Sequence, residues 1–212
     1  MKKISKEQFP TLTLGQKEAV LGFFLGGVNL TLPKNFKNPT FPKLFFKKKK
    51  EDYLLWIYSL FQSFIVRAPK AVFKNEKLIH FTLSFPRIPE FMNLFNFLYR
   101  IGDMGVLQRR ISNDFLNLLS PITLATWFMH NGSYTKNQLI LKTQGLSEPD
   151  QKMLADGLKK NLHLSFEIEQ RGGARGGVHF VLKNPSEISI FYQLVEAHLT
   201  EEFKKIFAND NA

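Results

Sequence analysis

Two apolar stretches, 20–29 (VLGFFLGGVN) and 124–133 (LATWFMHNGS), decide how this chain folds. Each predicts the last turns of a helix, because apolar residues recur at helical spacing and glycine or asparagine follows them. Each also has a helix-start signal before it. Thr13-x-x-Gln16 is a capping box, and Ser120-Pro121 places proline at a first helical position. The sequence therefore predicts two helices that end in similar motifs.

Small residues on these helices predict that the two pack against each other. Gly22, Gly26 and Ala125 offer little or no side chain, so two backbones can approach closely at these positions. The equivalent positions Gly27 and Asn131 close the two motifs and lie 104 residues apart. A central helix pair formed by two related halves is the expected result.

Outward from each stretch, helix-period and strand-period patterns alternate. Prolines in 29–46 restrict that basic, aromatic segment to edge or irregular strands. The other predicted segments are helices at 52–64, 91–98, 115–119, near 149–158 and at 188–207, and strands at 72–73, 79–85, 139–143, 162–168 and 178–182.

This order predicts an α+β chain with an internal repeat. Helix, hairpin, helix, hairpin and helix recur in each half, which gives two αββαββα halves and predicts pseudo-twofold symmetry within a monomer. We place the first half at residues 12–107, a linker at 108–119 and the second half at 120–207.

Composition and charge favour a polyanionic partner. The chain has 212 residues, a formal net charge of +11 and a pI near 9.8, and nucleic acid is the commonest polyanion. Eleven lysines and two glutamates give residues 1–50 a net +9. Without cysteine there is no disulfide framework or thiolate metal site. No apolar run reaches the roughly 20 residues of a membrane span, and we expect no secretory signal.

Basic residues in three places are the candidate nucleic-acid contacts. The lysines lie in the aromatic segment and in the run that follows it, two arginines lie in the linker, and two lie on the glycine-rich hairpin tip 171–177 (RGGARGG). Each group has a plainer alternative, a solvated turn or a flexible tip. The candidates are Lys34, Lys37, Lys43, Lys47, Lys48, Lys49, Lys50, Arg109, Arg110, Arg171 and Arg175.

Four segments resemble the LAGLIDADG homing endonuclease and intron maturase family. The stretch 20–30 is similar to the first signature LLGLLLGDASL, and 127–133 (WFMHNGS) to the second signature WFMDDGS. Residues 53–61 (YLLWIYSLF) are similar to the YLYWLYELF helix, and 141–147 (LKTQGLS) to LSTQSFT. The resemblance implies paired signature helices, saddle-shaped antiparallel sheets that lie in a DNA major groove, and terminal acids that bind the divalent metals used in cutting.

Both metal-binding acids of the resemblance are absent. Gly27 and Asn131 stand at the family's aspartate positions, and the preceding His130 favours softer metals than Mg²⁺. We therefore expect a catalytically inactive protein, not an enzyme, with no catalytic residue, no metal site and no cofactor.

The leading hypothesis is a protein that binds structured organellar RNA, as a ribonucleoprotein component such as a mitochondrial ribosome protein, or as an intron-splicing cofactor. We expect RNA as the partner in preference to DNA, and we expect no membrane association. A composition rich in Phe, Lys and Asn indicates an AT-rich genome and so a mitochondrion or other organelle. The alternative is a DNA homing endonuclease, active or inactivated. A protein-binding scaffold is a third interpretation, which the charge of residues 1–50 disfavours.

Overall fold

The computed structural model describes two compact units. It covers residues 11–32, 41–64, 67–102, 105–135, 137–143, 145–171 and 177–209. One unit combines Met1–Gln16 with Val28–Phe97, and the other combines Lys17–Gly27 with Leu98–Ala212. These units follow packing, whereas the halves 12–107 and 120–207 and the linker 108–119 describe the sequence repeat.

The two signature helices begin with the caps that the sequence predicts. In α1 (Leu14–Leu25), the Thr13 and Gln16 side chains each accept a hydrogen bond from the other residue's backbone N–H, at 3.3 and 3.0 Å. In α5 (Pro121–Asn131), the Ser120 hydroxyl accepts the Thr123 N–H at 3.3 Å. Both caps satisfy backbone donors that a helix start leaves open.

Within the second unit, α1 and α5 pack at the small residues. A Cβ added at Gly22 would lie 2.7 Å from the Thr126 Cβ, and one at Gly26 would lie 3.0 Å from the His130 Cβ. The contacting residues are related by the same 104-residue offset as the motifs, which is the pairing that a twofold axis between the helices requires. Close approach through glycine is confirmed.

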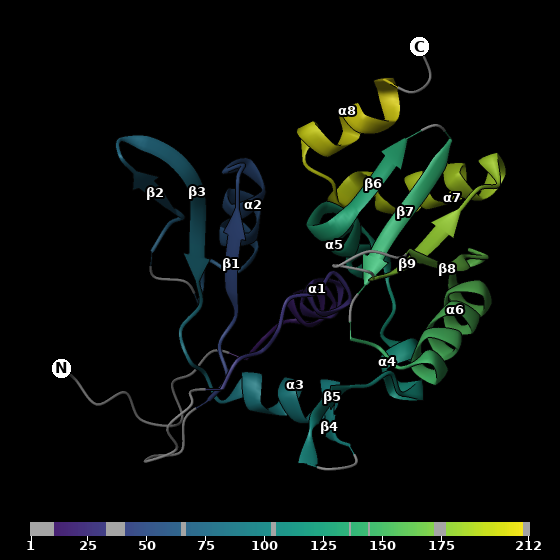
Figure 1. Ribbon diagram of the computed structural model, residues 1–212, viewed down its shortest axis with the longest axis horizontal. Coiled ribbons are helices and arrows are strands. Elements are labelled where there is room, and N and C mark those ends of the chain that lie inside the picture. Colours follow the sequence, from purple (N-terminus) through teal and green to yellow (C-terminus); the bar gives the residue numbers. More distant parts are fainter. Residues whose placement is uncertain are drawn as a thin grey trace. The chain divides into compact units, whose positions relative to one another are not determined.

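The first unit holds a three-stranded antiparallel sheet with the order β1-β3-β2 (Figure 1). Asn75 and Glu76, both at positive φ, form the two-residue turn between β2 and β3, as the right-handed twist of a hairpin favours. Thr31 and Lys43 add an isolated bridge. The elements are β1 (Phe45–Lys48), α2 (Asp52–Leu60), β2 (Lys70–Lys74), β3 (Lys77–Ser84) and α3 (Glu90–Leu98), whose last residue falls in the second unit.

This sheet has one covered face and one open face. Phe46 pairs with Leu83, and both are buried. The Phe46 and Phe61 rings both pack against Phe85, so the core beside α2 is largely aromatic. The neighbouring pair, Phe45 with Ser84, points to the opposite face and is exposed.

The second unit holds a four-stranded antiparallel sheet with the order β6-β7-β9-β8. Its covered face meets α5, where the Trp127 Nε1–H donates to the Lys142 carbonyl oxygen at 2.9 Å and the indole packs 5.4 Å from the Phe180 ring. The elements after α3 and besides α5 are β4 (Tyr99–Ile101), β5 (Leu107–Arg109), α4 (Asn113–Asn117), β6 (Gly132–Thr135), β7 (Gln138–Thr143), α6 (Glu148–Leu162), β8 (Glu167–Arg171), β9 (Gly177–Leu182), α7 (Pro185–Val195), the 3₁₀ helix η3 (Glu196–His198) and α8 (Glu201–Asn209).

Two local predictions are wrong, and one hairpin was not predicted. The strand expected from residue 162 begins only at Glu167, because α6 continues to Leu162 and His163 ends it in the left-handed conformation. The hairpin that the sequence patterns do not predict is β4–β5, at residues 99–109. The single final helix is three pieces, α7, η3 and α8, because Leu199 is extended. Among the described residues no helix is long and apolar enough to cross a membrane.

Candidate functional site

The two signature helices end differently. Gly27 lies in a turn after α1 with φ at +101°, a conformation that L side chains rarely adopt. Asn131 is the last residue of α5 and is half-buried. The equivalent positions of the repeat therefore differ in backbone conformation as well as in side chain.

These helix ends do not fit a divalent metal of the Mg²⁺ type. Such ions need several oxygen ligands, carboxylates above all, and Gly27 offers only backbone while Asn131 offers one neutral carbonyl. The His130 ring packs edge-on against Phe23, with centroids 6.3 Å apart, and lies against Gly26. Within the described ranges no three His, Cys, Asp or Glu residues come together as a metal-ligand group.

Arg109 is buried, only 6% exposed, and closes the end of α1. One guanidinium N–H donates to the Phe24 carbonyl oxygen at 2.6 Å, and the group lies 4.4 Å over the Phe24 ring. Burial lowers the pKa of Arg109, while charge interaction and a hydrogen bond with Tyr99 raise it. The structure thus uses this arginine inside the protein and does not present it to a phosphate.

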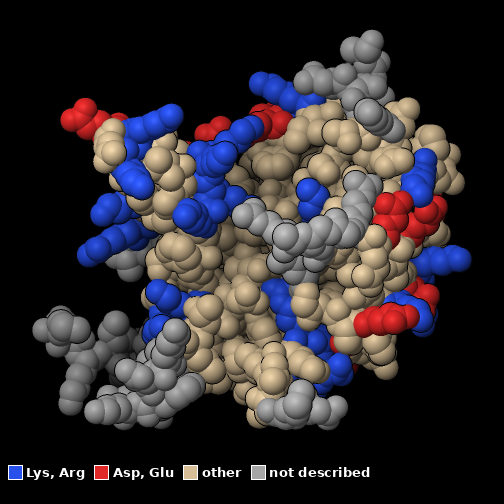
Figure 2. Space-filling model, in the orientation of Figure 1, with Lys and Arg blue, Asp and Glu red and all other residues tan. Residues whose placement is uncertain are grey.

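The open face of the first unit's sheet is basic and aromatic. Lys47 on β1 and Lys70 on β2 both pair with Thr82 on the central strand, so the two lysines flank it at the same level. Phe45 lies on this face as well and is 46% exposed. Figure 2 shows Lys and Arg gathered over β1, β2 and β3.

His80 lies two residues along β3 from Thr82, on the same face. Desolvation and, second, the charge of Lys47 lower the pKa of His80, so the ring is neutral near pH 7. Its Nδ1 is shielded from water and has no hydrogen-bond partner in the described part of the chain. The open face thus carries a neutral ring opposite Val72, two residues along β3 from the lysine-flanked Thr82.

The lysine run 47–50 is split by the strand. Lys48 points to the covered face, where its Nζ lies 5.6 Å from the Tyr53 ring centre and burial lowers its pKa to about 8. Lys49 and Lys50 are exposed in the turn before α2. Only part of the lysine run 47–50 therefore lies on the open face of the sheet.

The other candidate residues are scattered or lie outside the described residues. Lys43 is half-buried with its Nζ 6.0 Å over the Phe45 ring, and Arg110 is half-buried at the end of the β4–β5 hairpin. Arg171 ends β8, but its side chain is outside the described part. Also outside it are Lys34, Lys37 and Arg175.

Sequence reasoning missed Lys70. This residue belongs to β2, and its place on the open face follows from its pairing with Thr82 of β3. Alternation along β2 could have predicted that Lys70 and Val72 share one face of the sheet. No local pattern predicts that Lys47 of β1 lies on the same face, because that depends on the register between strands.

The second unit's sheet is not comparably basic on its open face. Lys183 contacts both Glu167 at 2.6 Å and Glu169 at 3.0 Å, so its charge is balanced by two carboxylates. In Figure 2 acidic groups lie among the basic ones over β8 and α6. The two repeat-related sheets thus differ in electrostatic character.

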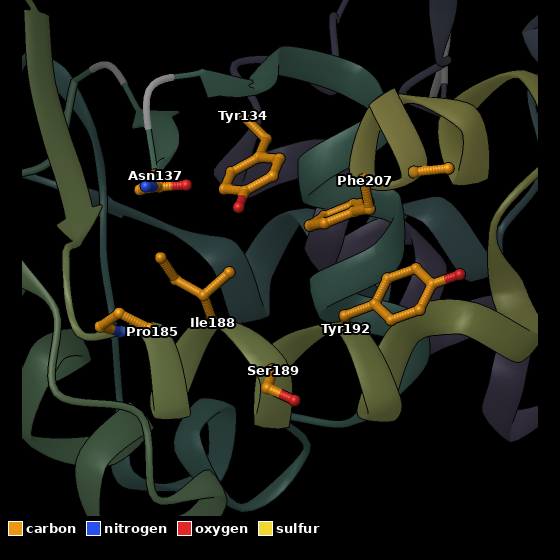
Figure 3. A pocket seen from close by; sticks show the side chains of 8 residues that line it. Tyr134, Asn137, Pro185, Ile188, Ser189, Tyr192 and Phe207 are labelled. Carbon is orange, nitrogen blue, oxygen red and sulfur yellow. The ribbon is translucent and has the colours of Figure 1, made fainter. Parts of the chain in front are cut away.

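A cavity of about 440 Å³ lies at the β6 edge of this unit, on the helix side of the sheet (Figure 3). Tyr134 of β6 and Tyr192 of α7 both approach the Phe207 ring of α8, with centroids 5.0 and 4.8 Å away. Its lining residues carry no charged side chain: Tyr134, Asn137, Pro185, Ile188, Ser189, Tyr192, Phe207 and Ala208. The lining thus offers hydroxyl and amide groups to a ligand but no carboxylate, imidazole, ammonium or guanidinium group.

Paired helices that end in glycine-rich or asparagine-containing motifs, each followed by antiparallel strands, define an α+β fold of two signature helices. The model of the LAGLIDADG DNA endonuclease family matches residues 17–189. The chain belongs to this family.

The similar proteins include endonucleases and longer proteins. A probable intron-encoded endonuclease 1 of Wickerhamomyces canadensis is 26% identical over 94% of this chain and 86% of its own length. The protein RecA of Mycolicibacterium fallax is 24% identical over 87% of this chain. The chain spans less than half the length of the RecA proteins that it matches.

Solved structures share the fold at low sequence identity. The homing endonuclease I-WcaI bound to its DNA recognition sequence is 22% identical, with a TM-score of 0.78 over 95% of this chain and 89% of that one. I-DmoI in complex with DNA and Ca is 15% identical, with a TM-score of 0.62 over 92% and 98%. These confirm the expected family fold.

Proposed function

We propose that this chain binds double-stranded DNA and does not cut it by the two-metal chemistry of its family. One observation carries the proposal: the helix ends that would hold the metals present Gly27 and Asn131 in place of carboxylates. Two relatives by fold are described with bound DNA, which supports DNA as the ligand.

Loss of the carboxylates removes each metal-dependent step. In two-metal hydrolysis the ions activate the attacking water and stabilise the leaving oxygen, and protein carboxylates hold them in place. An asparagine carbonyl lacks the charge for this role, and the left-handed φ of Gly27 disfavours any side chain there. Binding does not depend on these positions.

The first unit's open face supplies the affinity in this proposal. Lys47 and Lys70 stand where a phosphate backbone that crosses the sheet would meet both. The second sheet contributes less charge because Lys183 is already paired with Glu167 and Glu169. Each phosphate neutralised by a lysine adds about 0.9 to the salt dependence of binding to duplex DNA.

Selection from a random duplex DNA pool by the immobilised full-length chain tests this function. We expect a selected duplex that binds with steep salt dependence and stays intact in Mg²⁺ or Mn²⁺. The double variant Lys47→Ala/Lys70→Ala should lower the salt slope by about 2. Lys160→Ala, which removes an exposed charge on α6, is the control. Metal-dependent cutting that Asn131→Ala abolishes would overturn the proposal, as would failure to select any duplex.

Structured RNA is the second candidate ligand. The observation that favours it is the same loss of carboxylates, because an RNA-clamping protein has no use for them. In this version the chain serves an organellar ribonucleoprotein, ribosomal or intron-bound. Ultraviolet crosslinking in a native extract separates the two candidates: reads from ribosomal RNA or one intron favour RNA, and reads from DNA favour the first proposal.

A further inference from the structure

The cavity beside β6 in the second unit has no part in the proposed DNA binding. Its lining residues belong to β6, the turn between β6 and β7, α7 and α8, and none of them lies on the first unit's sheet. Its volume of about 440 Å³ falls within the roughly 300–1,000 Å³ of small-molecule sites. Protein interiors otherwise hold few voids larger than a water molecule. The cavity therefore has the size of a ligand site.

Two aromatic walls of this cavity are held in place by contacts outside it. The Phe207 ring is 5% exposed and packs against Phe128, with ring centroids 5.1 Å apart. The Tyr192 hydroxyl donates to a Glu196 carboxylate oxygen at 3.1 Å. Desolvation and, second, this hydrogen bond raise the pKa of Tyr192, so its phenol is neutral near pH 7. Walls that are already ordered lower the entropy cost of binding a ligand.

Two neutral polar groups in the lining are available to a ligand. They are the Tyr134 hydroxyl and the Asn137 amide, which lie on the same side of the cavity, above Ile188 in Figure 3. In the described part of the chain neither side chain hydrogen-bonds another residue. An amide both donates and accepts hydrogen bonds, and so does a hydroxyl. A ligand with a donor and an acceptor on one edge can satisfy these groups.

The lining also limits the charge of the ligand. A phosphate or carboxylate that leaves water for walls of Pro185, Ile188 and Phe207 loses its hydration without gaining an opposite charge, which costs several kcal/mol. On α8 the Lys204 ammonium is already paired with Glu201 at 2.7 Å. The ligand that fits is therefore uncharged, and the three aromatic rings of the lining favour a planar one.

We propose that this cavity binds a purine nucleoside, with the base beside the Tyr134 and Phe207 rings and its donor–acceptor edge on the Asn137 amide. An asparagine side chain can pair with adenine in this way through two hydrogen bonds. The volume exceeds that of the base alone and leaves room for the sugar, whose hydroxyls can bond Ser189 on α7. The inference goes beyond the proposed DNA binding and does not depend on it.

Titration with adenosine, followed by saturation-transfer NMR, tests the inference. Wild-type protein should bind adenosine more tightly than AMP, whose phosphate finds no cation, and more tightly than naphthalene, which has no polar edge. Tyr134→Phe removes only the hydroxyl, and Asn137→Gly removes the amide but accepts the φ of +56° at this position. Each variant should weaken adenosine binding about 2- to 12-fold, which is the contribution of one hydrogen bond.

The first unit supplies matched control variants. Asn75→Gly changes another asparagine at positive φ, and Tyr58→Phe changes a half-buried tyrosine of α2, so neither should alter adenosine binding. Failure of wild-type protein to bind adenosine would overturn the inference, and so would binding that Tyr134→Phe and Asn137→Gly both leave unchanged. AMP or naphthalene binding as tight as that of adenosine would overturn the assignment to a nucleoside. Duplex DNA binding, measured on the same samples, tests the proposed function separately.

Discussion

Restoring the two carboxylates tests whether the helix ends have lost more than side chains. In Gly27→Asp, the new Cβ meets nothing within 4 Å, so the cost is conformational and not steric. An L-residue at positive φ costs about 1–2 kcal/mol, and a negative charge at a helix C-terminus adds about 0.3–1. Replacing glycine also reduces the conformational freedom of the unfolded chain, which offsets the cost by about 0.4–1 kcal/mol. We expect a net loss of about 1–2 kcal/mol in the free energy of unfolding.

Asn131→Asp should cost less. Asn131 is already helical and the replacement has the same shape, so only the unfavourable charge at the helix end remains, about 0.3–1 kcal/mol. Urea denaturation of both single variants measures this difference. Gly105→Asp is the control for strain alone, because Gly105 also has positive φ and open space, and lies away from both signature helices.

The double variant Gly27→Asp/Asn131→Asp should gain affinity for divalent cations. A cation that binds only the folded state adds about 2.7 kcal/mol to the free energy of unfolding when its concentration is a hundredfold above the dissociation constant. The melting temperature rises as a result. We expect Mn²⁺ to stabilise the double variant and to leave wild-type protein and Gly105→Asp unchanged. Equal costs for Gly27→Asp and Asn131→Asp, or Mn²⁺ stabilisation of the wild type, would refute the reasoning.

Three further substitutions have expected outcomes that equilibrium unfolding can check. Lys48→Met should stabilise the fold by about 1–2 kcal/mol at pH 7, because burial disfavours the charged amine, and the gain should vanish as pH rises from about 8 to 10.5, where the folded lysine is neutral. Gly22→Ala should destabilise by about 3 kcal/mol, because the added methyl meets the Thr123 carbonyl oxygen; unchanged stability would contradict the helix contact. Arg109→Met should cost about 1–3 kcal/mol without altering the salt slope of DNA binding, and a lower slope would return Arg109 to the phosphate contacts.

Much of the fold could be predicted because it depends on local signals. Caps at Thr13 and Ser120, glycine at Gly22 and Gly26 and the alternation in β3 each act within a few residues. The failures come from competition between neighbours. Residues 162–168 alternate like a strand, but α6 continues through Leu162 and His163 accepts a left-handed end, which alternation alone cannot exclude.

The candidate site was less predictable because it depends on register and burial. The lysine run 47–50 reads as one patch, but a strand sends successive side chains to opposite faces, so Lys47 and Lys48 have different environments. Arg109 and Arg110 were candidate nucleic-acid contacts, with a solvated pair as the alternative, but Arg109 reaches the end of α1 from a hairpin that the sequence did not reveal. Long-range pairing decides both cases.

The asymmetry between the repeats bears on what the protein does. The two signature helices end differently, because α1 ends before a glycine at positive φ and α5 stays helical through Asn131. The two sheets differ as well, since Lys47 and Lys70 flank Thr82 on the first unit's open face, whereas in the second unit Lys183 is paired with Glu167 and Glu169. Two-metal cutting needs carboxylates at the helix ends, whereas the proposed DNA binding needs only a basic surface. The proposed loss of cleavage therefore follows from Gly27 and Asn131, and the proposed binding is assigned to the first unit's open face.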